Sequence, residues 1–176
     1  MRPFITVESF ELCLDLFLTA GYTKAGSHSV ELYDVDTDSW AIKPNNPYFP
    51  GGFYSNPIVY LDNSFFMFGG HETWNNSGSS ELITSFSLAT DSWIKRGEML
   101  MGRRSAGVLW TGDSFLVVGG ADSNGVQSGH KSEKCVFVDE YQLQCSYQEP
   151  TTPETLTTIN GAIVHLFPVP SDYCLL

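Results

Sequence analysis

A four-residue phrase that occurs twice constrains the fold of this chain more than any other sequence feature. Thr37-Asp38-Ser39-Trp40 returns unchanged at 90–93, about 50 residues later. An apolar run that ends in glycine precedes each copy, at 17–21 and at 66–70, and a third such run follows at 116–120. A unit that returns with this period is typical of arrays in which each unit is one small sheet packed against the next.

The pattern within each unit predicts strands rather than helices. Apolar residues nowhere recur with the spacing of an amphipathic helix over three turns. Each complete unit instead has four short apolar or alternating runs, joined by Asp, Asn and Gly residues that tolerate tight hairpins. We expect one domain over 1–176, with complete four-stranded antiparallel units at 55–96 and 105–148, a partial unit at 1–43 and a degenerate tail at 149–176.

Paired glycines and tryptophans have a direct structural interpretation in such an array. Glycine permits positive φ and close backbone approach where a strand ends in a sharp turn. A tryptophan fills the wedge between neighbouring sheets. The residues expected in these two roles are Gly21, Gly69, Gly70, Gly119, Gly120, Trp40 and Trp93.

These features resemble the kelch-repeat family. The resemblance is carried by the glycine pair after an apolar run, and by an aromatic residue followed, after six residues, by a tryptophan: Tyr33 to Trp40 and Phe86 to Trp93. Residues 99–107 look like the linker and first strand that open the next kelch unit.

The resemblance covers about residues 14–148 and implies an incomplete kelch-type β-propeller of four-stranded blades. The third unit departs from the pattern, because it has no tryptophan and Cys145 lies near that place. Two complete units and one partial unit are fewer than the roughly five to seven blades that close a ring. The resemblance therefore implies additional blades, from missing sequence or from another chain.

Charge and hydropathy exclude two classes of partner. The formal net charge is −11, so a nucleic-acid backbone would be repelled. The longest apolar runs are too short to span a bilayer, and we expect no membrane insertion. The first residues are charged too early for a secretory signal, so we interpret them as the start of a repeat.

Four cysteines bear on the compartment. Cys135 and Cys145 bracket one expected hairpin, the arrangement that a cross-strand disulfide needs; two reduced thiols are the alternative. The pairing of Cys13 and Cys174 stays open. The compartment is unassigned, with an extracellular location slightly favoured over a cytoplasmic one.

Three patterns that suggest chemistry have simpler explanations. Residues 112–116 resemble a lipase nucleophile block, but 62–66 occupy the equivalent turn without its Gly-Asp pair, so a hairpin explains both. Residues 34–38 resemble the start of a calcium loop, whose later glycine and glutamate positions are not matched. His28, His71 and His130 each follow a glycine run, at a spacing too wide for one metal. We expect no catalysis, no metal and no cofactor.

Loops are the expected functional part of the array. In an up-and-down blade, the loop after the second strand and the linker between blades emerge on one face; here these are 71–80, 121–132, 44–53 and 97–104. Exposed aromatic residues and arginines dominate recognition surfaces. The candidate partner-binding residues are Tyr48, Phe49, His71, Trp74, Arg103, Arg104, Asp122 and His130.

Some of these candidates have structural alternatives. Arg103 and Arg104 equally suit bonds to neighbouring carboxylates, and Tyr48 and Phe49 suit packing between sheets.

The sequence favours a non-catalytic module that binds a protein or peptide through one loop face. An extracellular adhesion or matrix module is an alternative, supported by the expected disulfide and by the glycosylation sequon at Asn75. A fragment of a galactose-oxidase-like enzyme is a further alternative, based on architecture alone because no set of matching copper ligands is present.

Overall fold

The computed structural model describes residues 16–18, 30–34, 37–50, 52–72, 78–122 and 131–148. Over these ranges every regular element is a β-strand, and all paired strands are antiparallel. The described part of the chain is therefore all-β, as the sequence pattern predicts. No described segment forms a helix that is long and apolar enough to cross a membrane.

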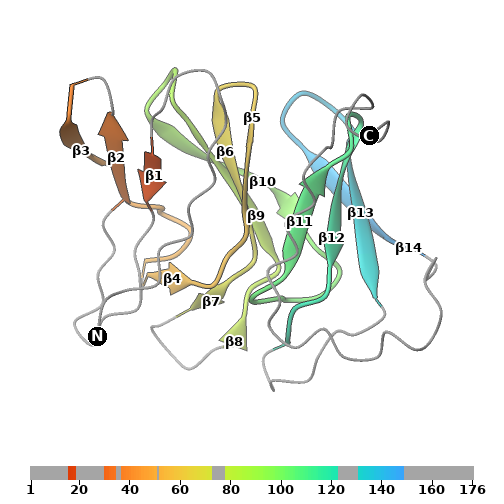
Figure 1. Ribbon diagram of the computed structural model, residues 1–176. Helices are drawn as coiled ribbons and strands as arrows, with labels where there is room; N and C mark the ends of the chain where they lie inside the picture. Colours follow the sequence, from red (N-terminus) through yellow and green to blue (C-terminus); the bar gives the residue numbers. More distant parts are fainter. Residues whose placement is uncertain are drawn as a thin grey trace, which may run out of the picture.

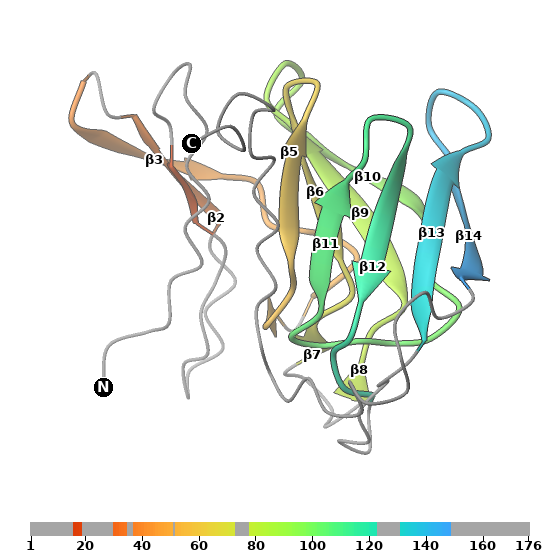
Figure 2. The same cartoon turned by 45° about the vertical axis from the view of Figure 1, so that its right-hand side comes forward.

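Three sheets stand in a row, and a small fourth sheet lies at one edge of the row (Figures 1 and 2). The first sheet has the order β1-β2-β3, from β1 (Leu16–Leu18), β2 (Val30–Asp34) and β3 (Ser39–Lys43). The second has the order β10-β9-β6-β5, from β5 (Ile58–Leu61), β6 (Ser64–Phe68), β9 (Leu82–Ser87) and β10 (Ser92–Glu98). The third has the order β11-β12-β13-β14, from β11 (Gly107–Trp110), β12 (Ser114–Val118), β13 (Ser132–Phe137) and β14 (Leu143–Gln148). The small sheet has the order β4-β7-β8, from β4 (Phe53–Tyr54), β7 (His71–Glu72) and β8 (Gly78–Ser79).

One register recurs in the three large sheets. Phe65 of β6 lies opposite Phe86, and Phe115, which has the same place in β12, lies opposite Cys135. The last two strands of each sheet then contribute a cross-strand pair at one repeated position: Tyr33 with Trp40, Phe86 with Trp93, and Cys135 with Cys145. The third sheet therefore has a cysteine pair where the other two have an aromatic pair.

The core consists of two apolar layers, one on each side of the second sheet. Side chains alternate between the faces of a strand. Phe66 and Phe68 accordingly join the layer against the third sheet, and Met67 joins the layer against the first. We call the side of a sheet that faces the preceding sheet its leading face, and the side that faces the next sheet its trailing face.

The Cys135–Cys145 disulfide is present and lies in the layer between the second and third sheets. Its two cysteines are directly opposite each other in β13 and β14, with Cα atoms 4.0 Å apart. The expected cross-strand disulfide is therefore confirmed. Cys13 and Cys174 lie outside the described residues.

The two tryptophans of the repeated phrase have different environments. Trp93 is 9% exposed between the first and second sheets, and its indole Nε1 donates to the Pro44 carbonyl at 2.6 Å. The expected wedge role of Trp93 is confirmed. The same expectation for Trp40 is wrong, because Trp40 is 52% exposed and its ring packs on Tyr33 at 4.8 Å. Trp40 is on the leading face of the first sheet, which points away from the second sheet.

The glycine pairs have the expected backbone conformation. The four described members, Gly69, Gly70, Gly119 and Gly120, all have positive φ, between 59° and 103°. At Gly69 a Cβ would lie 2.4 Å from the Arg103 carbonyl oxygen, so only glycine lets the linker pass this strand end. Gly21 lies outside the described residues.

Candidate functional site

Segments distant in sequence meet at the edge that carries the small sheet. The Gly70 amide donates to the Arg103 carbonyl and the Ser80 amide donates to the Gly70 carbonyl, each at 2.8 Å. Arg104 and Ala121 form an isolated antiparallel bridge. We call this surface, made of β4, β7, β8 and residues 99–106 and 119–122, the linker edge; the small sheet lies at the bottom of Figure 1.

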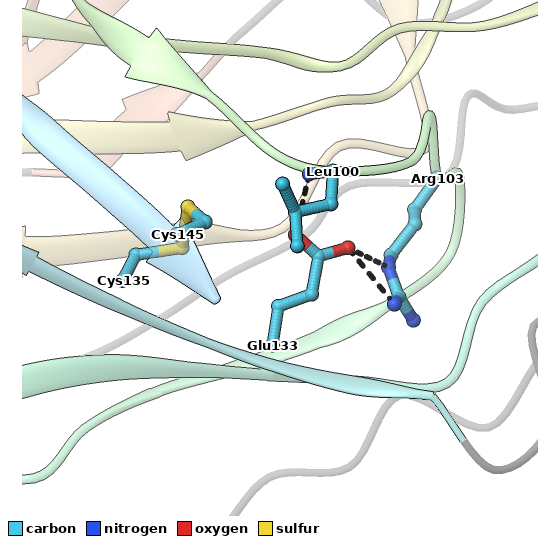
Figure 3. Close-up of a disulfide and its surroundings, with 5 residues drawn as sticks. All are labelled: Leu100, Arg103, Glu133, Cys135 and Cys145. Atoms are coloured by element: carbon cyan, nitrogen blue, oxygen red, sulfur yellow. Dashed lines mark hydrogen bonds and ion pairs between the residues drawn. A yellow bond between two sulfur atoms is a disulfide. The ribbon is translucent and has the colours of Figure 1, made fainter. Parts of the chain in front are cut away.

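Arg103 is the buried anchor of the linker edge. It is fully buried, and its Nε and Nη2 donate to Glu133 Oε1 at 3.1 and 3.0 Å (Figure 3). Its Nη1 donates to the Gly119 carbonyl at 2.8 Å, and Glu133 Oε2 accepts the Leu100 amide at 2.6 Å. The expectation that Arg103 contacts a partner is wrong, because no part of it reaches the surface. The alternative, a bond to a neighbouring carboxylate, is confirmed.

Arg104, the next residue, lies in a different environment. Its guanidinium is partly exposed, and its Nη1 lies 3.4 Å from His71 Nδ1. Arginine only donates, so in this contact Nδ1 of His71 is the acceptor. The ring of His71 also meets Tyr54 edge-on at 4.9 Å. None of the ion pairs among the described residues gives Arg104 a carboxylate.

A buried amide lies beside this pair. Asn56 is 7% exposed, and its Nδ2 has no hydrogen-bond partner among the residues that the structure describes. The Asn56 side chain packs over Gly70, the residue before His71. The equivalent position of the third sheet is Ala106, so the fold itself does not require an amide here.

Two serines next to these positions have a strained backbone. Ser55 and Ser105 have φ of 56° and 52°, in the left-handed region that residues other than glycine rarely adopt. The Ser105 amide donates to the Ser55 carbonyl at 2.8 Å, which joins the segment before β11 to the segment before β5. Strain of this kind often occurs at functional sites. The sequence pattern did not indicate Asn56, Ser55 or Ser105; the departure of Asn56 from the alanine of the next repeat is the signal that could have found it.

The remaining candidates divide between surface and core. Phe49 is 3% exposed and packs on Phe53 with ring centroids 5.0 Å apart, so its expected role in partner binding is wrong and its packing alternative is confirmed. Tyr48 is 37% exposed, and Asp122 is partly buried at the linker edge. Trp74 and His130 lie outside the described residues, as does His28.

The hairpin at residues 111–114 explains one suspected nucleophile. Ser114 is 1% exposed and its hydroxyl donates to Asp113, while the Thr111 hydroxyl also donates to that carboxylate. These hydrogen bonds, that of Ser114 first, and then the nearby Lys134, hold the pKa of Asp113 below its usual value. The interpretation of this segment as a hairpin turn is confirmed. No group of three or more potential metal ligands occurs in the part of the chain that the structure describes.

Comparison with known proteins supports the fold but does not assign the chain to a family. No protein-family model matches the chain. The chain is similar to the solved structure of YjhT, with a TM-score of 0.63 and 18% sequence identity over 79% of this chain. At that identity the likeness shows the fold alone. The match covers 50% of the YjhT chain, so this chain spans about half the length of that structure.

Proposed function

We propose that this chain is a non-catalytic recognition module, a kelch-type partial propeller that binds a protein or peptide through the linker edge. The three sheets with one repeated register support the propeller arrangement. The linker edge brings together two residues that the sequence selected for partner binding, His71 and Arg104. The observation that carries the proposal is the Arg104 guanidinium, which is partly buried and has no carboxylate partner among the described residues.

Composition makes this arginine unusual. Acidic residues outnumber Lys and Arg by 20 to 9, so a carboxylate partner is readily available to a basic side chain in this protein. Arg103, the adjacent residue, has such a partner in Glu133. Arg104 instead lies beside the His71 imidazole, so its charge is available for a group outside the chain.

The neighbouring polar groups indicate the chemistry of that group. The Arg104 guanidinium and the Asn56 Nδ2, which has no partner among the described residues, are both donors. A buried donor without an acceptor is unfavourable by roughly 1–3 kcal/mol. An acidic side chain or a C-terminal carboxylate supplies acceptors, and hydrogen bonds between charged partners are about twice as strong as neutral ones. We expect the bound segment to be acidic.

Peptide selection tests the proposal. Random peptides displayed on phage are selected against the immobilised chain, and enriched peptides are titrated by fluorescence anisotropy. We expect acidic peptides whose Kd rises tenfold or more for Arg104→Ala, which is about 1.4 kcal/mol. Lys95→Ala is the matched control, because Lys95 is a cation in an exposed ion pair with Glu98 of the same strand, and its Kd should not change. Equal binding by the native chain and Arg104→Ala, or no enrichment at all, would contradict the proposal.

A second proposal concerns the compartment. The Cys135–Cys145 disulfide favours an extracellular adhesion or matrix module, because disulfides persist in oxidising environments. Thiol alkylation of the natively isolated protein, followed by mass measurement, tests this. If Cys135 and Cys145 are alkylated without prior reduction, they are free thiols, and this result would contradict the extracellular proposal.

A further inference from the structure

Each large sheet has a leading face and a trailing face. Among the described residues, two of these faces have no neighbouring sheet against them. Within the molecule, the trailing face of the first sheet meets the leading face of the second, and the trailing face of the second meets the leading face of the third. The same kind of contact therefore occurs twice. The leading face of the first sheet and the trailing face of the third are the two faces that remain (Figure 1).

The leading face of the first sheet retains the features of a buried one. Trp40 has the register position of Trp93, yet it is 52% exposed where Trp93 is 9% exposed. The indole of Trp93 donates to a carbonyl of the preceding linker, whereas no described residue accepts from Trp40. Ile42, two residues further on the same face, is 81% exposed. An exposed aromatic and aliphatic pair of this kind marks an interaction surface.

The trailing face of the third sheet has the complementary pattern. Three apolar residues lie on this face: Leu109, Leu116 and Val118. They have the register positions of Val59, Phe66 and Phe68 in the second sheet. The second-sheet residues are buried, whereas the third-sheet residues are only partly buried. In the second sheet, Phe66 and Phe68 contact Phe115 on the next leading face, with ring centroids 5.1 and 5.0 Å apart.

We propose that a second copy of this chain docks head-to-tail, with its first sheet against the third sheet of its neighbour. The two faces are the two halves of a contact that the chain already makes internally, so the required register is present. The leading face carries Glu31, and the trailing face carries Lys134, which also forms an ion pair with Asp113 at 3.5 Å. Such a contact is heterologous, because the two partners contribute different surfaces.

A second copy is favoured over an unrelated partner, because the contact between these two kinds of face already occurs twice within one chain. Two copies of three sheets also make six, which lies within the usual range for a closed ring. This inference rests on the succession of sheets and is independent of the ligand of the linker edge.

Sedimentation velocity on the purified chain tests the inference. We expect a dimer or a larger head-to-tail species that dissociates on dilution. Trp40→Lys changes the leading face and Leu116→Lys changes the trailing face, and each should raise the dissociation constant by roughly thirtyfold or more. Val138→Lys is the matched control, because Val138 is a 57% exposed aliphatic residue that follows β13 and is on neither face. Circular dichroism of each variant verifies that the sheets are retained.

Mixing the two variants distinguishes a heterologous contact from a symmetric one. Each variant retains the face that the other has lost, so an equimolar mixture should form a one-to-one dimer although each variant alone is monomeric. A monomeric native chain would overturn the inference and would mean that other residues of the same chain cover these faces. A mixture that stays monomeric would overturn it as well.

Discussion

The Arg103–Glu133 ion pair provides a sharp test of how the linker edge is held in place. Both side chains are completely buried. The pair joins residues 99–104 to β13, with further bonds to the Leu100 amide and the Gly119 carbonyl. We consider Arg103→Met, Glu133→Leu and the double variant, each of which replaces a buried charge with an apolar side chain.

The expected magnitudes follow from the contacts. Arg103→Met leaves a buried carboxylate that keeps, among the described residues, the Leu100 amide as its donor. Removing one partner of a buried pair is destabilising by about 3–5 kcal/mol. Glu133→Leu leaves a buried guanidinium without its carboxylate, although Nη1 keeps its bond to the Gly119 carbonyl, and should have a similar effect. The double variant removes both charges, but the Leu100 amide loses its Glu133 acceptor and the Gly119 carbonyl loses its Arg103 donor, so it should lose about 1–3 kcal/mol. The double variant is therefore expected to be more stable than either single variant.

Urea denaturation followed by tryptophan fluorescence measures these free energies. Trp110 is a suitable reporter, because its ring packs against Phe115 at 4.8 Å in the layer beside the ion pair. Lys95→Met is the control, since it removes an exposed ion pair and should change stability by at most about 1 kcal/mol. The reasoning is refuted if each single variant loses less than about 1 kcal/mol, or if the double variant loses the sum of the two.

Three further predictions test the repeat. Gly69→Ala should destabilise the fold by roughly 2 kcal/mol more than Gly119→Ala in urea denaturation, because a Cβ at Gly69 meets a backbone oxygen at 2.4 Å whereas none lies within 4 Å of Gly119. Reduction of the Cys135–Cys145 disulfide should lower the free energy of unfolding by about 2–3 kcal/mol, measured with and without reductant. The Asp113 carboxyl should titrate below its usual pKa in an NMR pH series, so its contribution to stability is present at neutral pH and is lost as the pH falls through that lowered pKa.

Much of the fold follows from the sequence, because strand period and turn chemistry are local properties. The Asp62-Asn63 turn, for example, has φ of 48° and 57° and joins β5 to β6, as residues of these types allow. The small sheet is a different case. Its three strands have two residues each, too short for any hydrophobic period to be visible. The linker edge that depends on it was therefore only partly predictable.

Neighbouring residues of one type can have opposite roles at such an edge. Arg103 and Arg104 are adjacent and chemically identical, yet one is buried and the other is partly exposed. Successive side chains of an extended segment point to opposite sides, so at most one of the two can reach the core. Which one does so is decided by Glu133, 30 residues away in sequence, and no local pattern contains that information.

The repeated phrase shows the same principle for the whole array. Identical sequences place Trp40 and Trp93 at the same register position, and both sheets form as the pattern predicts. Their exposure nevertheless differs, because a sheet buries its leading face only when another sheet lies in front of it. Burial of such a face is thus a property of the contact between two sheets, not of either sheet alone. A face that carries the residues of such a contact, but has no sheet in front of it, is therefore the place to look for a partner.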